Sequence, residues 1–277
     1  MVIELRNIHF AYPSYPDKDV LSDLNCLLRP GERVGVIGKT GAGKSTFLQL
    51  CAGLLEPTGG VITINDRPAA KSVIWSEYRR NIGLVFQFPE NQLFEESVFD
   101  DVAFGVKKYY NGREQVEQSV LEALENVGLQ PEMYVKRSPH RLSSGEKRRV
   151  AIAGVIAMNP DFLFLDEPTI GLDYSGLCDI ESALLKLSSQ GKTVCTVSHN
   201  LDFITRFSER LIVLKDRTIK FDGPTRALFM NNELREELCV EKPEIVAICE
   251  TLAETYGEDI TGSFKIEEVL KYLQNRH

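Results

Sequence analysis

Residues 33–46 read RVGVIGKTGAGKST, and this stretch decides the fold. Its first five residues form a strand of the buried type. The glycine-rich loop that follows ends in Lys44, where a helix is expected to begin and run to about Leu54. The loop fits the phosphate-binding pattern GxxxxGK[ST] between a strand and a helix, as that pattern requires. The stretch therefore predicts a nucleotide-binding α/β domain, with an accidental glycine turn as the alternative.

Nine residues of this loop are expected to cradle the phosphates of ATP. They are Gly38, Lys39, Thr40, Gly41, Ala42, Gly43, Lys44, Ser45 and Thr46. Glycines let the backbone come close to phosphate oxygens, and the helix N-terminus attracts negative charge. Lys44 would reach the β- and γ-phosphates, and the Ser45 hydroxyl would ligate Mg²⁺.

Apolar or alternating runs elsewhere predict further strands. They lie at residues 2–12, 61–64, 162–165, 193–197 and 211–214. A helical pattern at 176–189 separates two of them, and this repetition favours a parallel sheet with covering helices. The run from 211 to 223 instead suggests a late hairpin.

The stretch FLFLDEP, residues 162–168, places two adjacent carboxylates after four apolar residues. In such folds ligands bind at the carboxyl ends of the strands. Asp166 would hold Mg²⁺, directly or through water, and Glu167 would polarise the attacking water as a general base. Alone, the stretch is equally consistent with an ordinary strand-end turn. With the phosphate loop, it indicates a nucleotidase or kinase.

A third stretch, LSSGEKRR at residues 142–149, has the pattern of a capping box. Ser143 would cap a helix running to about Ala157, and Glu146, three positions on, would bond back to the cap. Taken singly, an ordinary capped helix is the simpler interpretation.

This third stretch lies between the phosphate loop and the carboxylate strand. In that chain order, the three motifs resemble those of ATP-binding-cassette (ABC) ATPases, whose signature reads LSGGQ. The resemblance covers nearly all of residues 1–225. It implies a P-loop NTPase fold with a RecA-like core, an antiparallel β subdomain and a helical subdomain at about 89–159. Two such chains would clamp two ATP molecules head to tail. The signature residues Ser143, Ser144, Gly145 and Glu146 of each chain would then face the γ-phosphate held by the other.

The resemblance assigns roles to four more residues. Gln87 would contact Mg²⁺ and the attacking water, and Asp173 would lie at the dimer seam. His199 would lie near the γ-phosphate, although a lone histidine after a strand is usually structural. Tyr12 would stack on adenine, or would be a plain strand-end residue.

Ser144 departs from the family pattern, which usually has glycine there. Its Cβ and hydroxyl could restrain the approach of the backbone to phosphate. This puts in doubt the site that this chain's signature completes, and it slightly favours a heterodimer with a paralogue over a homodimer.

Two regions resemble the energy-coupling factor (ECF) branch, which serves vitamin and metal-ion uptake. One is FQFPENQLFEESVFDDVAFG at residues 86–105. The other is the tail, residues 226–277, which would be a helical dimerisation element. The branch implies a transmembrane coupling subunit, a substrate-binding membrane subunit and a peripheral position on the cytoplasmic face of the membrane. Asp100 and Asp101 would face basic residues of the coupling subunit.

Within the tail, one helical face would carry Ile245, Ile248, Leu252 and Tyr256. Ser263 would cap a last helix, with Ile266, Val269, Leu270 and Leu273 on its apolar face.

Other functions remain open. An importer ATPase fed by a binding protein is the nearest alternative, and an ABC ATPase of DNA repair or translation belongs to a different class. A net charge of −8 weakens a nucleic-acid-binding function. The six scattered cysteines predict buried, reduced thiols. The basic runs 79–80 and 147–149 predict solvated faces and ion pairs on helix surfaces, with a basic cluster beside bound phosphates as the alternative.

Overall fold

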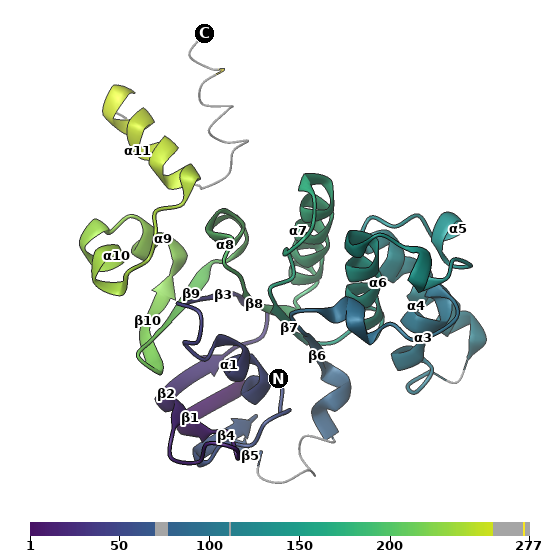
Figure 1. The fold of residues 1–277 in the computed structure, drawn as a ribbon, viewed down its shortest axis with the longest axis horizontal. Coiled ribbons are helices and arrows are strands. Elements are labelled where there is room, and N and C mark those ends of the chain that lie inside the picture. The colour runs from purple at the N-terminus through teal and green to yellow at the C-terminus, as the bar shows by residue number, and fades with distance from the viewer. Residues whose placement is uncertain (70–76, 111, 257–273, 275–277) are drawn as a thin grey trace.

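The computed structural model describes residues 1–69, 77–110, 112–256 and 274, and this part of the chain holds two sheets (Figure 1). The larger sheet has the strand order β10-β9-β3-β8-β7-β6. Its strands are β3 (Arg33–Ile37), β6 (Ile82–Val85), β7 (Phe162–Asp166), β8 (Thr193–Val197), β9 (Arg210–Lys215) and β10 (Thr218–Pro224). All neighbours are parallel except β9 and β10, which form the predicted hairpin. The predicted α/β fold is confirmed.

Side chains of the central strands alternate between two apolar clusters, one on each face of this sheet. On β7, Leu163 and Leu165 join one cluster, and Phe162 and Phe164 join the other. Burial on both faces explains why β7 begins with an unbroken apolar run, Phe162 to Leu165.

The smaller sheet is antiparallel, with the order β2-β1-β4-β5. Its strands are β1 (Ile3–Ala11), β2 (Asp19–Leu28), β4 (Gly59–Ile64) and β5 (Arg67–Pro68). Sequence analysis did not predict β2. Its buried positions run Leu21, Leu24, Cys26 and Leu28, and Asp23 lies between the first two with a left-handed φ of 48°. This irregularity breaks the alternation of side chains by which strands are recognised.

Helices cover both faces of the larger sheet. The described α-helices between β3 and β9 are α1 (Lys44–Cys51), α3 (Val98–Val106), α4 (Arg113–Asn126), α5 (Pro131–Tyr134), α6 (Ser144–Ile156), α7 (Tyr174–Ser189) and α8 (Leu201–Phe207). Side chains of α1 belong to one apolar cluster, whereas those of α7 and α8 belong to the other. Helices α3 to α6 form a group of their own beside β6 and β7, on the right in Figure 1.

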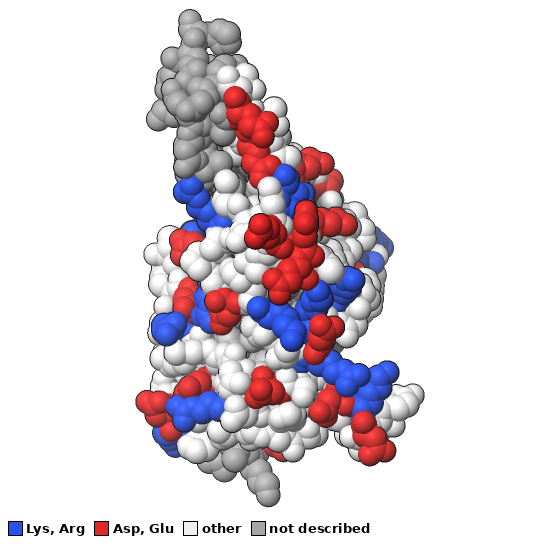
Figure 2. All heavy atoms as spheres, turned by 90° about the vertical axis from the view of Figure 1, so that its left-hand side faces the viewer, with Lys and Arg blue, Asp and Glu red and all other residues white. Residues whose placement is uncertain are grey.

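The chain continues into α9 (Thr225–Phe229), α10 (Asn232–Leu238) and α11 (Glu244–Tyr256). On α11, Ile245, Val246 and Cys249 are buried, but Ile248 is 48% exposed, so the packed face is rotated from the predicted one. The last helix predicted after Ser263 lies outside the described residues. Acidic side chains gather over these C-terminal helices (Figure 2).

The cysteine prediction is partly wrong. Cys26, Cys51, Cys195 and Cys249 are buried, and burial raises the pKa of Cys26 to about 12. Cys178, however, is half-buried and Cys239 is exposed. Within the described part of the chain, no helix combines the length and the apolar character needed to cross a membrane.

Candidate active site

A hollow of about 230 Å³ lies at the carboxyl ends of the central strands. Its lining residues are Val20, Thr40, Gly41, Gly43, Lys44, Ser45, Thr46, Gln87, Asp166, Glu167 and His199. They come from β2, from the phosphate loop after β3 and the start of α1, from the loop after β6, and from the ends of β7 and β8. Residues from distant parts of the sequence meet here because parallel strands bring their carboxyl ends to one edge.

Two glycines of the phosphate loop are required by their surroundings. A Cβ at Gly38, which has φ of 154°, would collide with the carbonyl oxygen of Leu214. A Cβ at Gly43, with φ of 94°, would lie 2.6 Å from Cδ2 of Leu21. Gly41 also has a positive φ, 82°, but a Cβ there would have no neighbour within 4 Å. The absence of a side chain at Gly38 and at Gly43 therefore allows the loop to pack closely against β9 and β2.

The Lys44 ammonium group is folded over its own loop. Its Nζ donates hydrogen bonds to the carbonyl oxygens of Gly38, at 2.8 Å, and Lys39, at 3.2 Å. Burial lowers the pKa of Lys44, although the nearby Glu167 and Asp166 carboxylates oppose this. A partly desolvated cation interacts strongly with an anion brought to it, as a phosphate would be.

Both carboxylates after β7 are buried, with Asp166 7% and Glu167 3% exposed. Burial raises the pKa of each, while a hydrogen bond from Ser45 acts in the opposite direction on Asp166. Glu167 has a left-handed φ of 53°, and its Oε2 accepts a hydrogen bond of 3.1 Å from the backbone N–H of His199. Its Oε1 is buried, makes no hydrogen bond, and lies 3.5 Å from His199 Nε2. This oxygen therefore has lone pairs left to accept a proton.

Tyr12 follows β1, and its side chain lies beside the hollow against the start of α1. Its hydroxyl is 3.0 Å from Thr46 Oγ1, and its ring, 38% exposed, meets Phe10 edge-on at 4.9 Å. An exposed ring held in this way is available for stacking on a base.

The signature residues lie on a different surface. Ser143 caps α6 in the predicted capping box. The Ser143 N–H donates to Glu146 Oε2 at 2.7 Å, and the Glu146 N–H donates to Ser143 Oγ at 3.3 Å. Glu146 also accepts a 2.6 Å hydrogen bond from the Tyr134 hydroxyl, which lowers the pKa of Glu146. Ser143 and Ser144 are exposed.

Asp173 lies next to this turn. It caps α7 by accepting a 2.8 Å hydrogen bond from the Gly176 N–H. The adjacent Leu172 lies 3.6 Å from the position of a Cβ at Gly145. Among the described residues, neither Asp173 nor the signature lines the hollow. The predicted site residues therefore form two surfaces of one chain.

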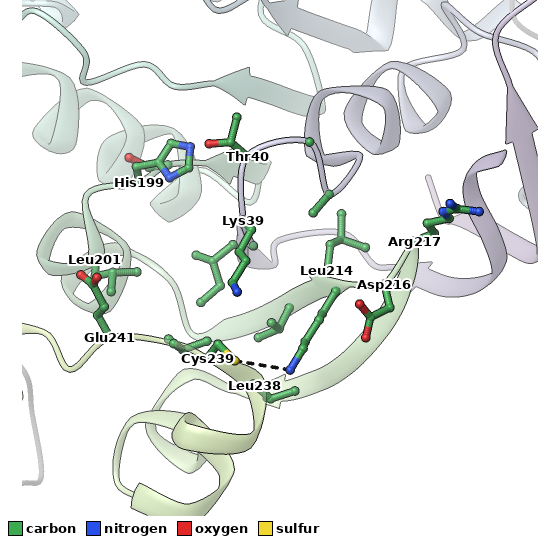
Figure 3. A pocket seen from close by; sticks show the side chains of 18 residues that line it. Lys39, Thr40, His199, Leu201, Leu214, Asp216, Arg217, Leu238, Cys239 and Glu241 are labelled. Atoms are coloured by element: carbon green, nitrogen blue, oxygen red, sulfur yellow. Dashed lines mark hydrogen bonds between the residues drawn. The ribbon is translucent and has the colours of Figure 1, made fainter. Parts of the chain in front are cut away.

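A second hollow, of about 570 Å³, lies on the other side of the phosphate loop (Figure 3). Gly38, Lys39 and Ala42 line this one. Figure 3 shows Lys39 pointing from the loop toward Leu238, the last residue of α10, and Cys239, which follows it. Thr40, Gly41 and His199 line both hollows.

The model of the family described as ABC transporter matches residues 21–170, from β2 through β7. The chain belongs to the ABC transporter family. This matched range contains the phosphate loop, the signature and both carboxylates.

Named relatives indicate which branch of the ABC family this chain resembles. The chain is 41% identical to the energy-coupling factor transporter ATP-binding protein EcfA2 of Clostridium perfringens, over 100% of each chain. It is 35% identical to the energy-coupling factor transporter ATP-binding protein EcfA of Methanocaldococcus jannaschii, over 99% of this chain and 97% of the other. The predicted resemblance to the ECF branch is confirmed.

Solved ABC structures agree with the fold. The chain is similar to cbiO1 of Clostridium perfringens, part of the ABC transporter complex cbiONQ. The TM-score is 0.74 and the identity 32%, over 90% of this chain and 98% of the other. It is also similar to a dimeric ATP-binding cassette in a post-hydrolysis state with ADP and Pi. There the TM-score is 0.73 and the identity 31%, over 80% and 98% of the two chains.

One basic run of this ABC protein lies differently from the prediction. Lys147, Arg148 and Arg149 were expected on a solvated face, but Arg148 is only 3% exposed. It shares a buried face of α6 with Ile152 and Ile156, four and eight positions on. That spacing, visible in the sequence, could have identified Arg148 as an inward-facing residue.

The role expected for Asp101 is not supported by its contacts. Its Oδ1 accepts hydrogen bonds from the backbone N–H groups of Phe94 and Glu95, at 3.1 and 3.2 Å. Asp100 pairs with Lys107 at 2.9 Å. Asp101 thus holds the preceding loop in shape, and Asp100 has its partner at the C-cap of its own helix.

Proposed function

We propose that this chain is the ATP-hydrolysing subunit of an energy-coupling factor transporter that powers uptake of a vitamin or metal ion. One observation carries the proposal. The hollow at the strand ends joins a phosphate loop, a buried general base with a free oxygen, and a histidine. The names of the full-length relatives supply the transporter branch.

ATP would bind with its phosphates on the loop 38–46 and its base against Tyr12. Lys44 would then exchange its two carbonyl acceptors for phosphate oxygens, which carry full charge and form stronger hydrogen bonds. The uncapped N-terminus of α1 would face the same phosphates.

The donor set of the hollow fits Mg²⁺. Ser45, Gln87 and Asp166 offer a hydroxyl, an amide and a carboxylate oxygen, the hard ligands that Mg²⁺ binds together with phosphates. When bound, this ion neutralises charge that develops on the phosphate oxygens.

Glu167 would orient the attacking water and accept its proton at Oε1. Its raised pKa makes the Glu167 carboxylate a stronger acceptor for the proton of the attacking water. His199 would lie at the γ-phosphate, because its backbone N–H anchors Oε2 of Glu167 and its ring reaches Oε1. Positioning and electrostatics would supply most of the catalysis.

Two chains would be needed for a complete site. The signature of one chain, with Asp173 beside it, would close on the phosphate loop of the other. Ser144 slightly favours a paralogue as the second chain. Residues 226–277, of which α9 to α11 are described, would contribute a dimerisation element.

The membrane coupling subunit would dock on the loop after β6 and on α3. Phe88, Phe94 and Phe104 are 51%, 59% and 59% exposed, and the rings of Phe94 and Phe104 meet edge-on at 5.0 Å. Exposed aromatic side chains in one patch are typical of a binding surface. We therefore place the docking contact on these rings rather than on Asp100 and Asp101. The chain would then lie on the cytoplasmic face of the membrane.

Partner identification tests this proposal. The tagged chain is purified from gently solubilised native membranes, and the co-purifying proteins are identified by mass spectrometry. Multi-span membrane proteins with a second ABC ATPase and no binding protein would support it. Recovery with a binding-protein-dependent importer, or with ribosomal or DNA-repair proteins alone, would overturn the transporter branch.

A further inference from the structure

Arg148 is a buried cation inside α6. Only 4% of its side chain is exposed, yet Glu90 is the only carboxylate bonded to it in the described residues. Its three guanidinium nitrogens donate hydrogen bonds to the loop at 87–90 and to the segment 167–170. A buried charge is tolerated only when its partners are held in place, so its partners and the guanidinium fix one another.

The first set of bonds holds the loop that carries Gln87. Nε and Nη2 of Arg148 each lie 3.2 Å from an oxygen of Glu90, in a bidentate pair. Nη2 also donates a 2.9 Å hydrogen bond to the carbonyl oxygen of Gln87. The Gln87 side chain lines the hollow, so its backbone is fixed from outside the hollow.

The second set holds the backbone of the general base. Nη1 donates to the carbonyl oxygen of Glu167 at 3.3 Å and also to that of Ile170. The Glu167 N–H donates to Val197 on the neighbouring strand at 2.9 Å. Residues other than glycine rarely adopt a φ of 53°, and this backbone must be held in place by its neighbours.

We infer that Arg148 is a positioning residue for ATP hydrolysis, tying the backbones of Gln87 and Glu167 to each other and to the signature helix. Arg148 does not line the hollow among the described residues, so it acts through these two. The same bonds would carry a displacement of the loop at 87–90 to the backbone of Glu167. That last step, from a docked membrane subunit to the general base, rests on the proposed function.

The test compares Arg148→Met and Arg148→Lys with a matched control on the same helix, Arg149→Met. Arg149 is also partly buried and pairs with Asp179 at 2.9 Å, but its carbonyl acceptors are Val127 and Gly128, away from the hollow. Each full-length variant is purified with the partners that the wild type carries. Basal ATPase kcat and KM, binding of a fluorescent ATP analogue and melting temperature are measured.

Arg148→Met is expected to lower kcat about 10- to 100-fold, because small misplacements of catalytic groups have effects of this size. Binding of the analogue should change by less than about threefold. Arg148→Lys should lose most of the same kcat, since one ammonium cannot replace a bidentate fork with further donors. Arg149→Met should lower the melting temperature and leave the kcat of the folded protein at the wild-type value. Wild-type kcat in folded Arg148→Met, or an equal loss in Arg149→Met, would overturn the inference.

A second measurement asks whether Arg148 acts through Glu90. The double variant Glu90→Gln/Arg148→Met should have the kcat of Arg148→Met alone, because the two side chains form one unit. A loss equal to the product of the two single losses would contradict this. Basal hydrolysis needs no transported substrate, so these outcomes are independent of whether partner identification supports an ECF transporter.

Discussion

The N-termini of α1 and α6 are both expected to face phosphate, but they are built in opposite ways. At α1 the cap is Gly43, in a left-handed conformation and with no side-chain hydrogen bond. At α6 the cap is Ser143, and the capping box satisfies both the Ser143 and the Glu146 N–H groups. The backbone N–H groups at the start of α1 have no side-chain cap and can bind a ligand. Those of Ser143 and Glu146 at the start of α6 are already hydrogen-bonded within the chain.

The carboxylates beside the two helix ends differ in a corresponding way. Burial raises the pKa of Asp166 and Glu167 beside α1, so charge in that region is held at a cost. Hydrogen bonds from Tyr134 and Ser143 lower the pKa of Glu146 at α6. The α1 side is thus prepared for chemistry at the expense of stability, and the α6 side is a stable surface for a second chain.

The largest expected effect tests the chemistry assigned to the α1 side. Glu167→Gln should lower kcat by about 100- to 1000-fold or more, because the general base is lost. ATP binding should persist, since Lys44 and the loop are unchanged. The substitution also removes a buried charge, so the nucleotide-free protein should gain roughly 1 kcal/mol of stability. Steady-state ATPase assays, nucleotide binding and thermal melting measure these three quantities.

Glu181→Gln is the matched control for this substitution. Glu181 is a partly buried carboxylate with a 15% exposed side chain, and it pairs with Arg206 at 2.9 Å, between α7 and α8. Its loss should lower stability by about 1 kcal/mol and spare kcat. Near-normal turnover in Glu167→Gln would contradict the base assignment. A lower melting temperature in that variant would contradict the stability cost inferred for the α1 side.

A smaller effect should come from adding a Cβ at the uncapped end. Gly43→Ala meets Leu21 Cδ2 at 2.6 Å, whereas Gly41→Ala meets nothing within 4 Å, and both residues have positive φ. Both substitutions should lower stability by about 1 kcal/mol, because alanine is disfavoured at positive φ. Only Gly43→Ala should also weaken ATP binding, by about tenfold. Melting curves and nucleotide titrations separate the two costs. Equal losses of ATP binding would show that the contact with β2 does not matter.

The two sides should also respond to acid at different pH. Glu167 has a raised pKa, so it takes up its proton above the ordinary value of 4.5, and turnover should fall there first. Glu146 has a lowered pKa, so its contribution to stability is present above 4.5 and is lost only as pH falls below that value. The check is kcat against pH, together with the difference in melting temperature between wild type and Glu146→Gln against pH. If the contribution of Glu146 to stability were lost at a higher pH than turnover, the order expected for the two sides would be wrong.

The parts of the site that could be predicted from the sequence are those formed by residues close together in the chain. The phosphate loop, the carboxylate strand and the capping box each depend on neighbours within a few positions, and the structure places them as expected. The inward-facing position of Arg148 could be read from its helical spacing with Ile152 and Ile156, but its partner Glu90, 58 positions away, could not. Asp101 was assigned outward because nothing in the sequence indicates that its carboxylate turns back to the amides of Phe94 and Glu95. Long-range burial, more than local pattern, decides which charges are structural.

The smallest expected effect concerns Ser144, on the α6 side. Ser144 is the first residue of α6 and lies outside the left-handed region, so its backbone does not require glycine. Any cost of this serine must therefore arise from close approach to a second chain's phosphate. Ser144→Gly should raise kcat by about two- to threefold and lower stability by up to about 1 kcal/mol, through the greater flexibility of glycine at a helix start. Steady-state ATPase assays and melting curves on the purified complex provide the check. A fall in kcat would instead indicate that the Ser144 hydroxyl donates to that phosphate, and the α6 end would then be more than a capped surface.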